Sequence, residues 1–275
     1  TGCGKGKALM RLILLDTQEK ARENFYPLAL SRPLWELRCG ITSLGEKLTA
    51  AVGVNNVAYF VPDYMAAVYR AEVQNPVNDL SVLSGDNLLV VDPRVKAETL
   101  TVAAHGPSEV GLDEQGSVLY ARIAKNDVRK LQTDSIDNFI CSAKTQLPNV
   151  KCKLGTWQYA WDLVLASPEQ ITADFMAASR SGIEGTIEQP NAIRGNKKDV
   201  YIARGVKVHP MVVIDAENGP IYIDNDAEIH PFSRIEGPCY IGEQSVLLGT
   251  RCREGNSIGP VCRIGGELEA SIIHA

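Results

Sequence analysis

Two histidines in the last third of the chain have a spacing that could bring their side chains together. His209 and His230 each follow an aliphatic residue and precede a proline, and they are 21 residues apart. Two neighbouring imidazoles could supply a general base or bind a metal ion. Because no carboxylate or other third ligand is evident beside them, the pair falls short of a zinc site. We therefore favour a stacked pair at a surface or at an interface between subunits.

The element that must position these histidines is a repeat of six residues that begins near residue 200. An aliphatic anchor recurs at every sixth position, with two interruptions, and the residue four positions later is small or slim. This pattern is typical of hexapeptide repeats, in which three short strands form one coil of about eighteen residues. One coil plus a three-residue insertion accounts for the spacing of His209 and His230, so we expect them to stack and face outward. The anchors are Ile202, Val208, Ile214, Ile223, Ile229, Ile235, Ile241, Leu247, Ile258 and Ile264.

The first two thirds of the chain alternate short apolar runs with helical patterns. We predict buried strands at 9–15, 57–61 and 88–91, a further strand at 80–83, and helices at 42–52 and 64–73. This alternation predicts an α/β, Rossmann-like domain with a largely parallel sheet. A stretch rich in Gly, Pro and Asn at 182–198 is typical of a linker. The predicted organisation is therefore a flexible leader (1–10), an α/β domain (11–190) and a parallel β-helix (191–275).

Composition narrows the range of partners. The 275 residues carry a net charge of −5, which favours neither nucleic acid nor an anionic membrane as partner. No run of eighteen apolar residues is present to span a bilayer. The seven cysteines lack C-x-x-C spacing, so we expect reduced thiols and a cytoplasmic location. The segment 1–7 partly resembles a phosphate-binding loop but has Ala8 where Ser or Thr is required, and we interpret it as the leader.

Three segments carry a resemblance to a known family. The segment 27–38 (PLALSRPLWELR), after a leading strand, resembles the opening of sugar nucleotidyltransferases. It is most similar to those related to the bifunctional N-acetylglucosamine-1-phosphate uridylyltransferase/glucosamine-1-phosphate acetyltransferase. The segment 161–164 (WDLV) and the repeat phrases at 219–223, 236–241 and 259–266 extend this resemblance over the chain past residue 10. It implies a nucleotidyltransferase-like domain followed by a left-handed parallel β-helix that usually forms a homotrimer.

The resemblance also implies a reaction and a set of site residues. The reaction would be nucleotidyl transfer from a nucleoside triphosphate to a sugar 1-phosphate, with Mg²⁺ neutralising the phosphates. It makes Arg32 and Asp86 the catalytic candidates, and Asp86 is also the candidate Mg²⁺ ligand. Arg22 and Arg38 are candidates for substrate binding by bidentate contacts. Structural ion pairs or solvated positions remain alternatives for all four residues, and the structural alternative is the stronger one for Arg22.

Two departures from the family favour a different interpretation of the first domain. Sugar nucleotidyltransferases carry a glycine-rich loop after the first strand, whose N–H groups hold phosphates, whereas the segment 16–22 of this chain contains no glycine. They also carry a lysine where this chain has Leu34. The alternative is a catalytically degenerate protein that binds a sugar nucleotide or serves as an oligomeric scaffold.

The repeat region suggests acyl transfer as a second activity. In related acyltransferases a histidine acts as base on the sugar amine, and acyl-CoA lies between neighbouring β-helices. His230 and His274 are the candidates in this sequence. The chain ends after about four coils without a capping element, so we expect it to be truncated relative to the family. Acetyl-CoA would then be a co-substrate of a longer form.

Overall fold

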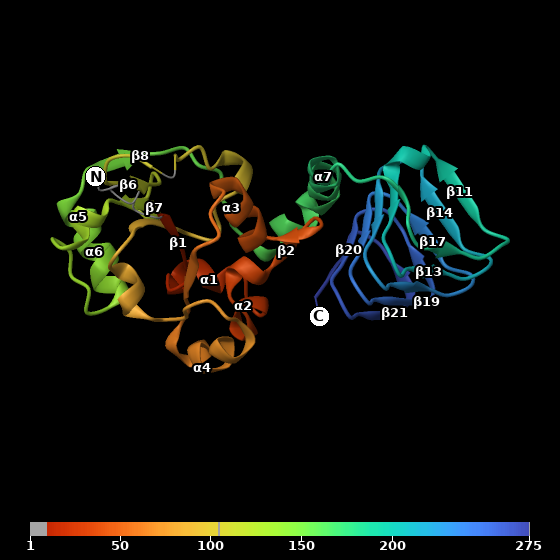
Figure 1. Cartoon of the computed structure of the whole chain (residues 1–275), viewed down its shortest axis with the longest axis horizontal. Helices are drawn as coiled ribbons and strands as arrows, with labels where there is room; N and C mark the ends of the chain where they lie inside the picture. The colour runs from red at the N-terminus through yellow and green to blue at the C-terminus, as the bar shows by residue number, and fades with distance from the viewer. Residues whose placement is uncertain (1–9, 104, 275) are drawn as a thin grey trace, which may run out of the picture. The chain divides into compact units, whose positions relative to one another are not determined.

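The computed structural model describes residues 10–103 and 105–274, and the chain divides into two compact units (Figure 1). The first unit comprises Thr1–Glu36 and Leu44–Gln158, and the second comprises Leu37–Ser43 and Tyr159–Ala275. This division differs from the boundary near Asn191 predicted from the sequence. Residues 1–9 of the predicted leader lie outside the described residues, whereas Met10, its last residue, begins a strand. Within the described part of the chain, no helix is long and apolar enough to cross a membrane.

The first unit is built on a six-stranded mixed sheet. The strand order is β4-β1-β5-β7-β6-β8, in which β4, β1 and β5 are parallel, β7 is antiparallel to both neighbours, and β8 is parallel to β6. The sequence predicts a largely parallel sheet, and the antiparallel pairings of β7 are the difference. The strands are β1 (Met10–Leu15), β4 (Val57–Phe60), β5 (Asn87–Val91), β6 (Glu109–Leu112), β7 (Val118–Ile123) and β8 (Asn149–Lys151).

Helices cover both faces of this sheet. Side chains alternate along a strand, so Leu12 and Leu14 of β1 pack in one apolar cluster, and Ile13 and Leu15 pack in another. The first cluster includes residues of α3 and α4, and the second includes residues of α5 and α6. This double burial explains why β1 is a continuous apolar run from Leu12 to Leu15, and it agrees with an α/β class for the domain. The helices of this unit are α1 (Glu19–Glu23), α2 (Leu28–Ser31), α3 (Leu44–Val52), α4 (Asp63–Glu72), α5 (Lys125–Val128) and α6 (Ile136–Gln146), with 3₁₀ turns η1 (Leu34–Glu36), η2 (Leu80–Leu83) and η3 (Ala97–Thr99).

One predicted strand of this unit is wrong. Residues 80–83 form the 3₁₀ turn η2 instead of a strand, because the side chain of Asp79 accepts a hydrogen bond from the Ser81 amide (2.9 Å). An aspartate that caps a nearby amide stabilises a helical turn at the expense of extended structure. Val82 and Leu83 are still buried, which explains why the segment has the composition of a core strand.

The second unit begins with a short hairpin and a long helix. The hairpin consists of β2 (Arg38–Cys39) and β3 (Thr42–Ser43), and the helix is α7 (Ala160–Ala178). Asp174 of the helix accepts a hydrogen bond from the Ile41 amide (2.8 Å), and Ser257 donates one to the carbonyl oxygen of Gly40 (2.6 Å). These contacts place the hairpin in the second unit. Pro168 lies inside α7.

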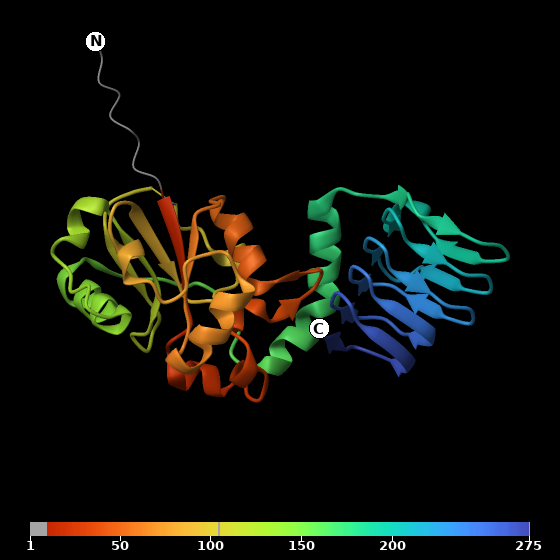
Figure 2. The same cartoon turned by 60° about the horizontal axis from the view of Figure 1, so that its bottom comes forward.

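The remainder of the second unit is a stack of parallel strands (Figures 1 and 2). One sheet contains β9, β12, β15, β18, β20 and β22, and the other strands stack in two further columns that join at β19 and β21. In the first of these sheets, Tyr201 pairs with Tyr222, which is 21 residues further along the chain. Tyr222 pairs with Tyr240 and Tyr240 with Ser257, at spacings of 18 and 17 residues. The strands are β9 (Gly182–Ile183), β10 (Thr186–Ile187), β11 (Ala192–Gly195), β12 (Val200–Ile202), β13 (Lys207–Val208), β14 (Val213–Ala216), β15 (Ile221–Ile223), β16 (Glu228–Ile229), β17 (Arg234–Glu236), β18 (Cys239–Ile241), β19 (Val246–Cys252), β20 (Asn256–Ile258), β21 (Arg263–Leu268) and β22 (Ile272–Ile273), with the 3₁₀ turn η4 (Lys197–Asp199) before β12.

The predicted anchors form the core of this stack. Each anchor from Ile202 to Ile258 is buried, and Ile264 packs against the same cluster. Parallel strands with this repeating register are compatible with the predicted β-helix, and its handedness stays a prediction. The first strands of the stack, β9 to β11, precede residue 200, so the coils begin earlier than the six-residue count suggests.

Candidate functional site

The connections in the first unit diverge at β1. Strand β4 lies on one side of β1, and strand β5 lies on the other. In open α/β sheets, ligands bind beyond the carboxyl ends of the strands at such a switch point, because the diverging connections leave a crevice there. The residues that follow β1 are Asp16, Thr17 and Gln18. This edge of the sheet is therefore where a site is expected.

A cavity of about 400 Å³ opens at this edge. Its walls come from the end of β1 and the loop after it, from the turn between β6 and β7, and from α6. Its volume is in the range of small-molecule pockets. The lining residues are Leu15, Thr17, Gln18, Gln115, Gly116, Ser117, Val118, Asp137, Ile140, Cys141 and Lys144.

Polar groups at the mouth of the cavity are already hydrogen-bonded to one another. Thr17 Oγ1 donates to Asp137 Oδ1 (3.1 Å), and Gln18 Nε2 donates to the carbonyl oxygen of Val118 (3.2 Å). Lys144, in the last turn of α6, donates to the carbonyl oxygen of Gly116 (2.6 Å) and is exposed. Among the described residues that line the cavity, Lys144 is the only cationic side chain. An ammonium group at this position can bind a phosphate group.

A buried ion pair lies where the chain leaves β1. Arg22 of α1 pairs with Asp16, which also accepts a hydrogen bond from the Leu34 amide (2.8 Å). Arg22 donates in addition to the carbonyl oxygen of Ala29 and is only 2% exposed. Burial raises the pKa of Asp16 to about 7, although Arg22 and the Leu34 amide act to lower it. The internal partners of Arg22 favour a structural role over the substrate binding that the resemblance implies.

Asp86 lies at the opposite edge of the sheet from the cavity. It precedes β5, and its carboxylate accepts from Arg11 Nη2 (3.0 Å) and Asn56 Nδ2 (3.4 Å). A guanidinium and an amide N–H are donors, whereas Mg²⁺ requires oxygen ligands. These surroundings do not fit a Mg²⁺ ion bound to Asp86.

Two aspartates that the sequence prediction did not single out follow strands at the same edge of the sheet as the cavity. Asp16 follows β1, and Asp92 follows β5. Asp92 is buried, and its carboxylate accepts from Arg94 Nη2 (2.6 Å) and from the Arg94 backbone amide (2.8 Å). The signal that could have identified both residues is their position directly after a buried strand.

The two arginines of the 27–38 motif fall in different compact units. Arg32, in the first unit, is half-buried at the end of α2, and its charge lowers the pKa of Glu36, which burial raises more strongly. Arg38, in the second unit, donates to the carbonyl oxygen of Ile41 and lies 5.2 Å from the centroid of the Tyr240 ring. The structure therefore does not define a common site for these two residues.

The two histidines that are candidates for acyl transfer lie on different sheets of the second unit. His230 follows β16 and His274 follows β22, and these strands belong to different sheets. His209 and His230 do stack, with their ring centroids 5.2 Å apart, which confirms the prediction for this pair. Glu228, which the sequence prediction missed as a third ligand, lies beside both rings.

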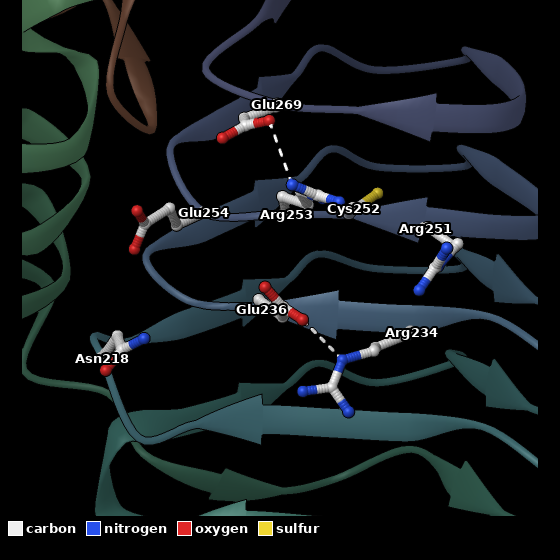
Figure 3. A pocket seen from close by; sticks show the side chains of 8 residues that line it. All are labelled: Asn218, Arg234, Glu236, Arg251, Cys252, Arg253, Glu254 and Glu269. Carbon is white, nitrogen blue, oxygen red and sulfur yellow. Dashed lines mark hydrogen bonds and ion pairs between the residues drawn. The ribbon is translucent and has the colours of Figure 1, made fainter.

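A second hollow, of about 260 Å³, lies on the surface of the strand stack (Figure 3). Its arginines already have carboxylate partners on the same or neighbouring coils. Arg234 pairs with Asp215 and Glu236, and Arg253 pairs with Glu267 and Glu269. Paired guanidinium groups offer less to an incoming anion, so this hollow is better explained as a ladder of ion pairs between coils. Its lining residues are Asn218, Arg234, Glu236, Arg251, Cys252, Arg253, Glu254 and Glu269.

The first unit is thus an α/β domain with a cavity of small-molecule size at a switch point of its sheet. A family model described as sugar nucleotidyl transferase matches residues 12–181, which is more than half of the chain. The chain therefore belongs to the sugar nucleotidyl transferase family. Such a domain acts on a nucleotide and a sugar phosphate. A comparison with curated proteins found no match.

Proposed function

We propose that the chain transfers a nucleotidyl group from a nucleoside triphosphate to a sugar 1-phosphate in the cavity beyond β1. The observation that supports this most is the position of the cavity, at the switch point of the sheet and within the segment that the family model matches. In this reaction a phosphate oxygen of the sugar phosphate attacks the α-phosphorus. The bond from that phosphorus to the bridging oxygen breaks, and pyrophosphate leaves.

The side chains around the cavity would bind and orient the substrates. Lys144 would exchange its hydrogen bond to the Gly116 carbonyl for one to a phosphate oxygen and stabilise negative charge. Thr17 and Gln18 would orient the nucleotide, since both carry polar groups at the cavity mouth. Leu15, Val118 and Ile140 form an apolar wall that suits one face of a base.

Mg²⁺ enters this proposal as part of the substrate. Mg²⁺ dehydrates reluctantly, and it is commonly held by substrate phosphates with one or two carboxylates. The triphosphate would therefore arrive as its Mg²⁺ complex. The chain's own contribution is to hold the complex through Lys144 and to exclude water with the apolar wall.

The test measures pyrophosphate release from a panel of nucleoside triphosphates and sugar 1-phosphates in the presence of Mg²⁺. Lys144→Met should lower kcat/KM by about 10- to 100-fold, because a hydrogen bond to a charged group contributes about 1.5–3 kcal/mol. Lys130→Met is the matched control, since Lys130 is exposed, pairs with Asp127 and does not line the cavity. It should change kcat/KM by less than about twofold.

Other outcomes separate the remaining candidates. Saturable nucleotide binding without turnover would favour a degenerate sugar-nucleotide-binding or scaffold protein. No turnover and no nucleotide binding would contradict the proposal. Thiol release from acetyl-CoA would favour acyl transfer through His230 or His274, and a homotrimer in solution would agree with assembly through the repeat coils. None of the observations described above favours acyl transfer over nucleotidyl transfer.

A further inference from the structure

The outer surface of the strand stack carries a cluster of two histidines and a glutamate. Val208 of β13 pairs with Ile229 of β16, so the next residues, His209 and His230, lie side by side on adjacent coils. Glu228 lies two residues before His230 and points to the same outer face, because side chains alternate along a strand. Its Oε1 atom is 2.8 Å from His209 Nε2 and 3.5 Å from His230 Nε2.

The distances in this cluster are close to those of a metal centre. The ligand atoms of His209, Glu228 and His230 all lie within 4.8 Å of one another. A tetrahedral Zn²⁺ ion with bonds of about 2.0–2.1 Å holds its ligand atoms about 3.3 Å apart. Small side-chain rotations would therefore be enough to place all three atoms around one ion. The side chains are between 28% and 40% exposed, which leaves a path for the ion to enter.

The donor set also fits a particular class of ion. Two imidazole nitrogens and one carboxylate oxygen are ligands that Zn²⁺ binds, whereas Mg²⁺ and Ca²⁺ favour oxygen ligands alone. Three protein ligands leave the fourth tetrahedral position for water or another small ligand. The site would differ from a closed structural zinc site in this respect.

A fourth residue lies in position to orient one of the imidazoles. Glu188 is on the preceding coil, beside His209, because its amide donates to the carbonyl oxygen of Val208. Its Oε2 atom is 3.6 Å from His209 Nδ1, within ion-pair distance. A carboxylate on this side favours the proton on Nδ1 and leaves Nε2 free to bind a metal ion. This arrangement of carboxylate, histidine and ligand atom is the one that metal sites use to fix the tautomer.

We propose that His209, Glu228 and His230 form a binding site for one Zn²⁺ ion, with Glu188 as a positioning residue for His209. The ion would join two adjacent coils of the second unit. The proposal does not depend on nucleotidyl transfer, because every residue of the cluster belongs to the second unit.

The experiment titrates the full chain, freed of metal by a chelator that is then removed, with Zn²⁺ in a calorimeter. One equivalent should bind in the micromolar range or tighter. Co²⁺ serves as a spectroscopic probe, and its visible absorption should show a centre of low coordination number. The near-ultraviolet band of cobalt thiolates should be absent, which excludes the cysteines as ligands.

Single variants identify the ligands. His209→Gln, Glu228→Gln and His230→Gln should each weaken Zn²⁺ binding by at least about 100-fold, and Glu188→Gln should weaken it by about 10- to 100-fold. His105→Gln is the matched control, because His105 is exposed in the first unit and lies outside the cluster. It should leave the affinity unchanged.

Circular dichroism checks that the variants remain folded. If a histidine variant unfolds, Glu228→Gln decides the matter, since it keeps the size of the side chain. Absence of stoichiometric binding would overturn the proposal. Binding that persists at full strength in Glu228→Gln, or a cobalt spectrum with a thiolate band, would overturn it as well.

Discussion

The buried pair of Asp16 and Arg22 makes the stability of the first unit depend on pH. Burial raises the pKa of Asp16 to about 7 in the folded chain, above the value of about 4 expected when the chain is unfolded. Between these two pH values the folded chain holds a proton that the unfolded chain has released. The stabilisation is therefore fully present below about pH 4 and is lost as the pH rises to about 7. The expected loss between pH 5 and pH 7 is about 2 kcal/mol.

Replacing Arg22 by methionine should make this dependence steeper. The charge of Arg22 is the largest influence that lowers the pKa of Asp16, so the pKa should rise further in Arg22→Met. At pH 8 the folded variant must bury Asp16 either as an unpaired carboxylate or as a protonated carboxyl group. The second choice is also costly, because the carboxyl group of the unfolded chain has lost its proton at this pH. Removing one partner of a buried pair costs about 3–5 kcal/mol. The loss should be smaller at pH 5, because Asp16 is protonated there in the folded chain with or without Arg22 and no buried carboxylate is left unpaired.

The assay is urea unfolding at pH 5 and pH 8, followed by tryptophan fluorescence. Trp35 and Trp157 are each 3% exposed and belong to the first unit, whereas Trp161 of the second unit is 57% exposed. The fluorescence change therefore reports mainly on the first unit. The double variant Asp16→Asn/Arg22→Met is the control, because it removes both charges. It should lose less stability than Arg22→Met at pH 8 and show a flatter dependence on pH.

Two results would refute this reasoning. One is a loss of stability in Arg22→Met that is the same at pH 5 and pH 8. The other is a double variant that keeps the full dependence on pH, since another group would then have to be responsible. Either result would mean that Asp16 does not hold a proton in the folded chain at neutral pH.

Two further predictions concern the second unit. Gly40 has a φ of 85°, and a Cβ atom there would meet Asp174 Oδ2 at 2.6 Å, so Gly40→Ala should lower the melting temperature more than Gly53→Ala. Gly53 also has a positive φ but open space around it, and equal shifts would contradict the role of the close contact. Ile223→Ala removes a side chain that is 0% exposed and should cost about 2–5 kcal/mol by chemical unfolding. Ile183→Ala, at a position that is 46% exposed, should cost less than about 1 kcal/mol, and comparable losses would contradict the assignment of the core.

The strand stack could be predicted because its information is local and repeated. Each anchor requires only an aliphatic residue at a regular interval, and all the anchors from Ile202 to Ile258 are buried. The count misses Cys252, which pairs with Ile235 at an anchor position, because that coil is shorter by one residue than the one from Ile229 to Leu247 (252 − 235 = 17, against 247 − 229 = 18). A periodic pattern identifies such a fold even where single coils change length.

Three strands of the α/β domain could be predicted from local patterns, but their arrangement in the sheet could not. Strands β1, β4 and β5 are apolar runs because both of their faces are buried. Strand β8 is exposed along its whole length and carries no such signal. The antiparallel position of β7 and the assignment of the hairpin 37–43 to the second unit depend on contacts between distant residues. No pattern within a short window contains that information.

The direction of the strands explains why Asp86 lies away from the cavity. Asp86 precedes β5, so it lies at the amino edge, whereas Asp92 follows the same strand at the edge where ligands bind. Lys144 lies on a helix far along the sequence and reaches the cavity only through the packing of α6 on the sheet. Glu228 lies only two residues before His230 in the sequence. Its proximity to His209 as well depends on the register between adjacent coils, which the sequence does not show.

The missing glycine loop has a structural counterpart that bears on the proposed function. In a glycine-rich loop, backbone N–H groups hold the phosphates. In this chain the segment after β1 forms α1, and Arg22 of that helix points inward to Asp16 and Ala29. The charge of Arg22 is therefore paired inside the protein, at the end of β1. In the proposed reaction, phosphate binding at this edge would therefore depend on a side chain from elsewhere, and Lys144 is the residue that α6 places at the cavity. This dependence is why a single substitution at Lys144 is a stringent test of nucleotidyl transfer.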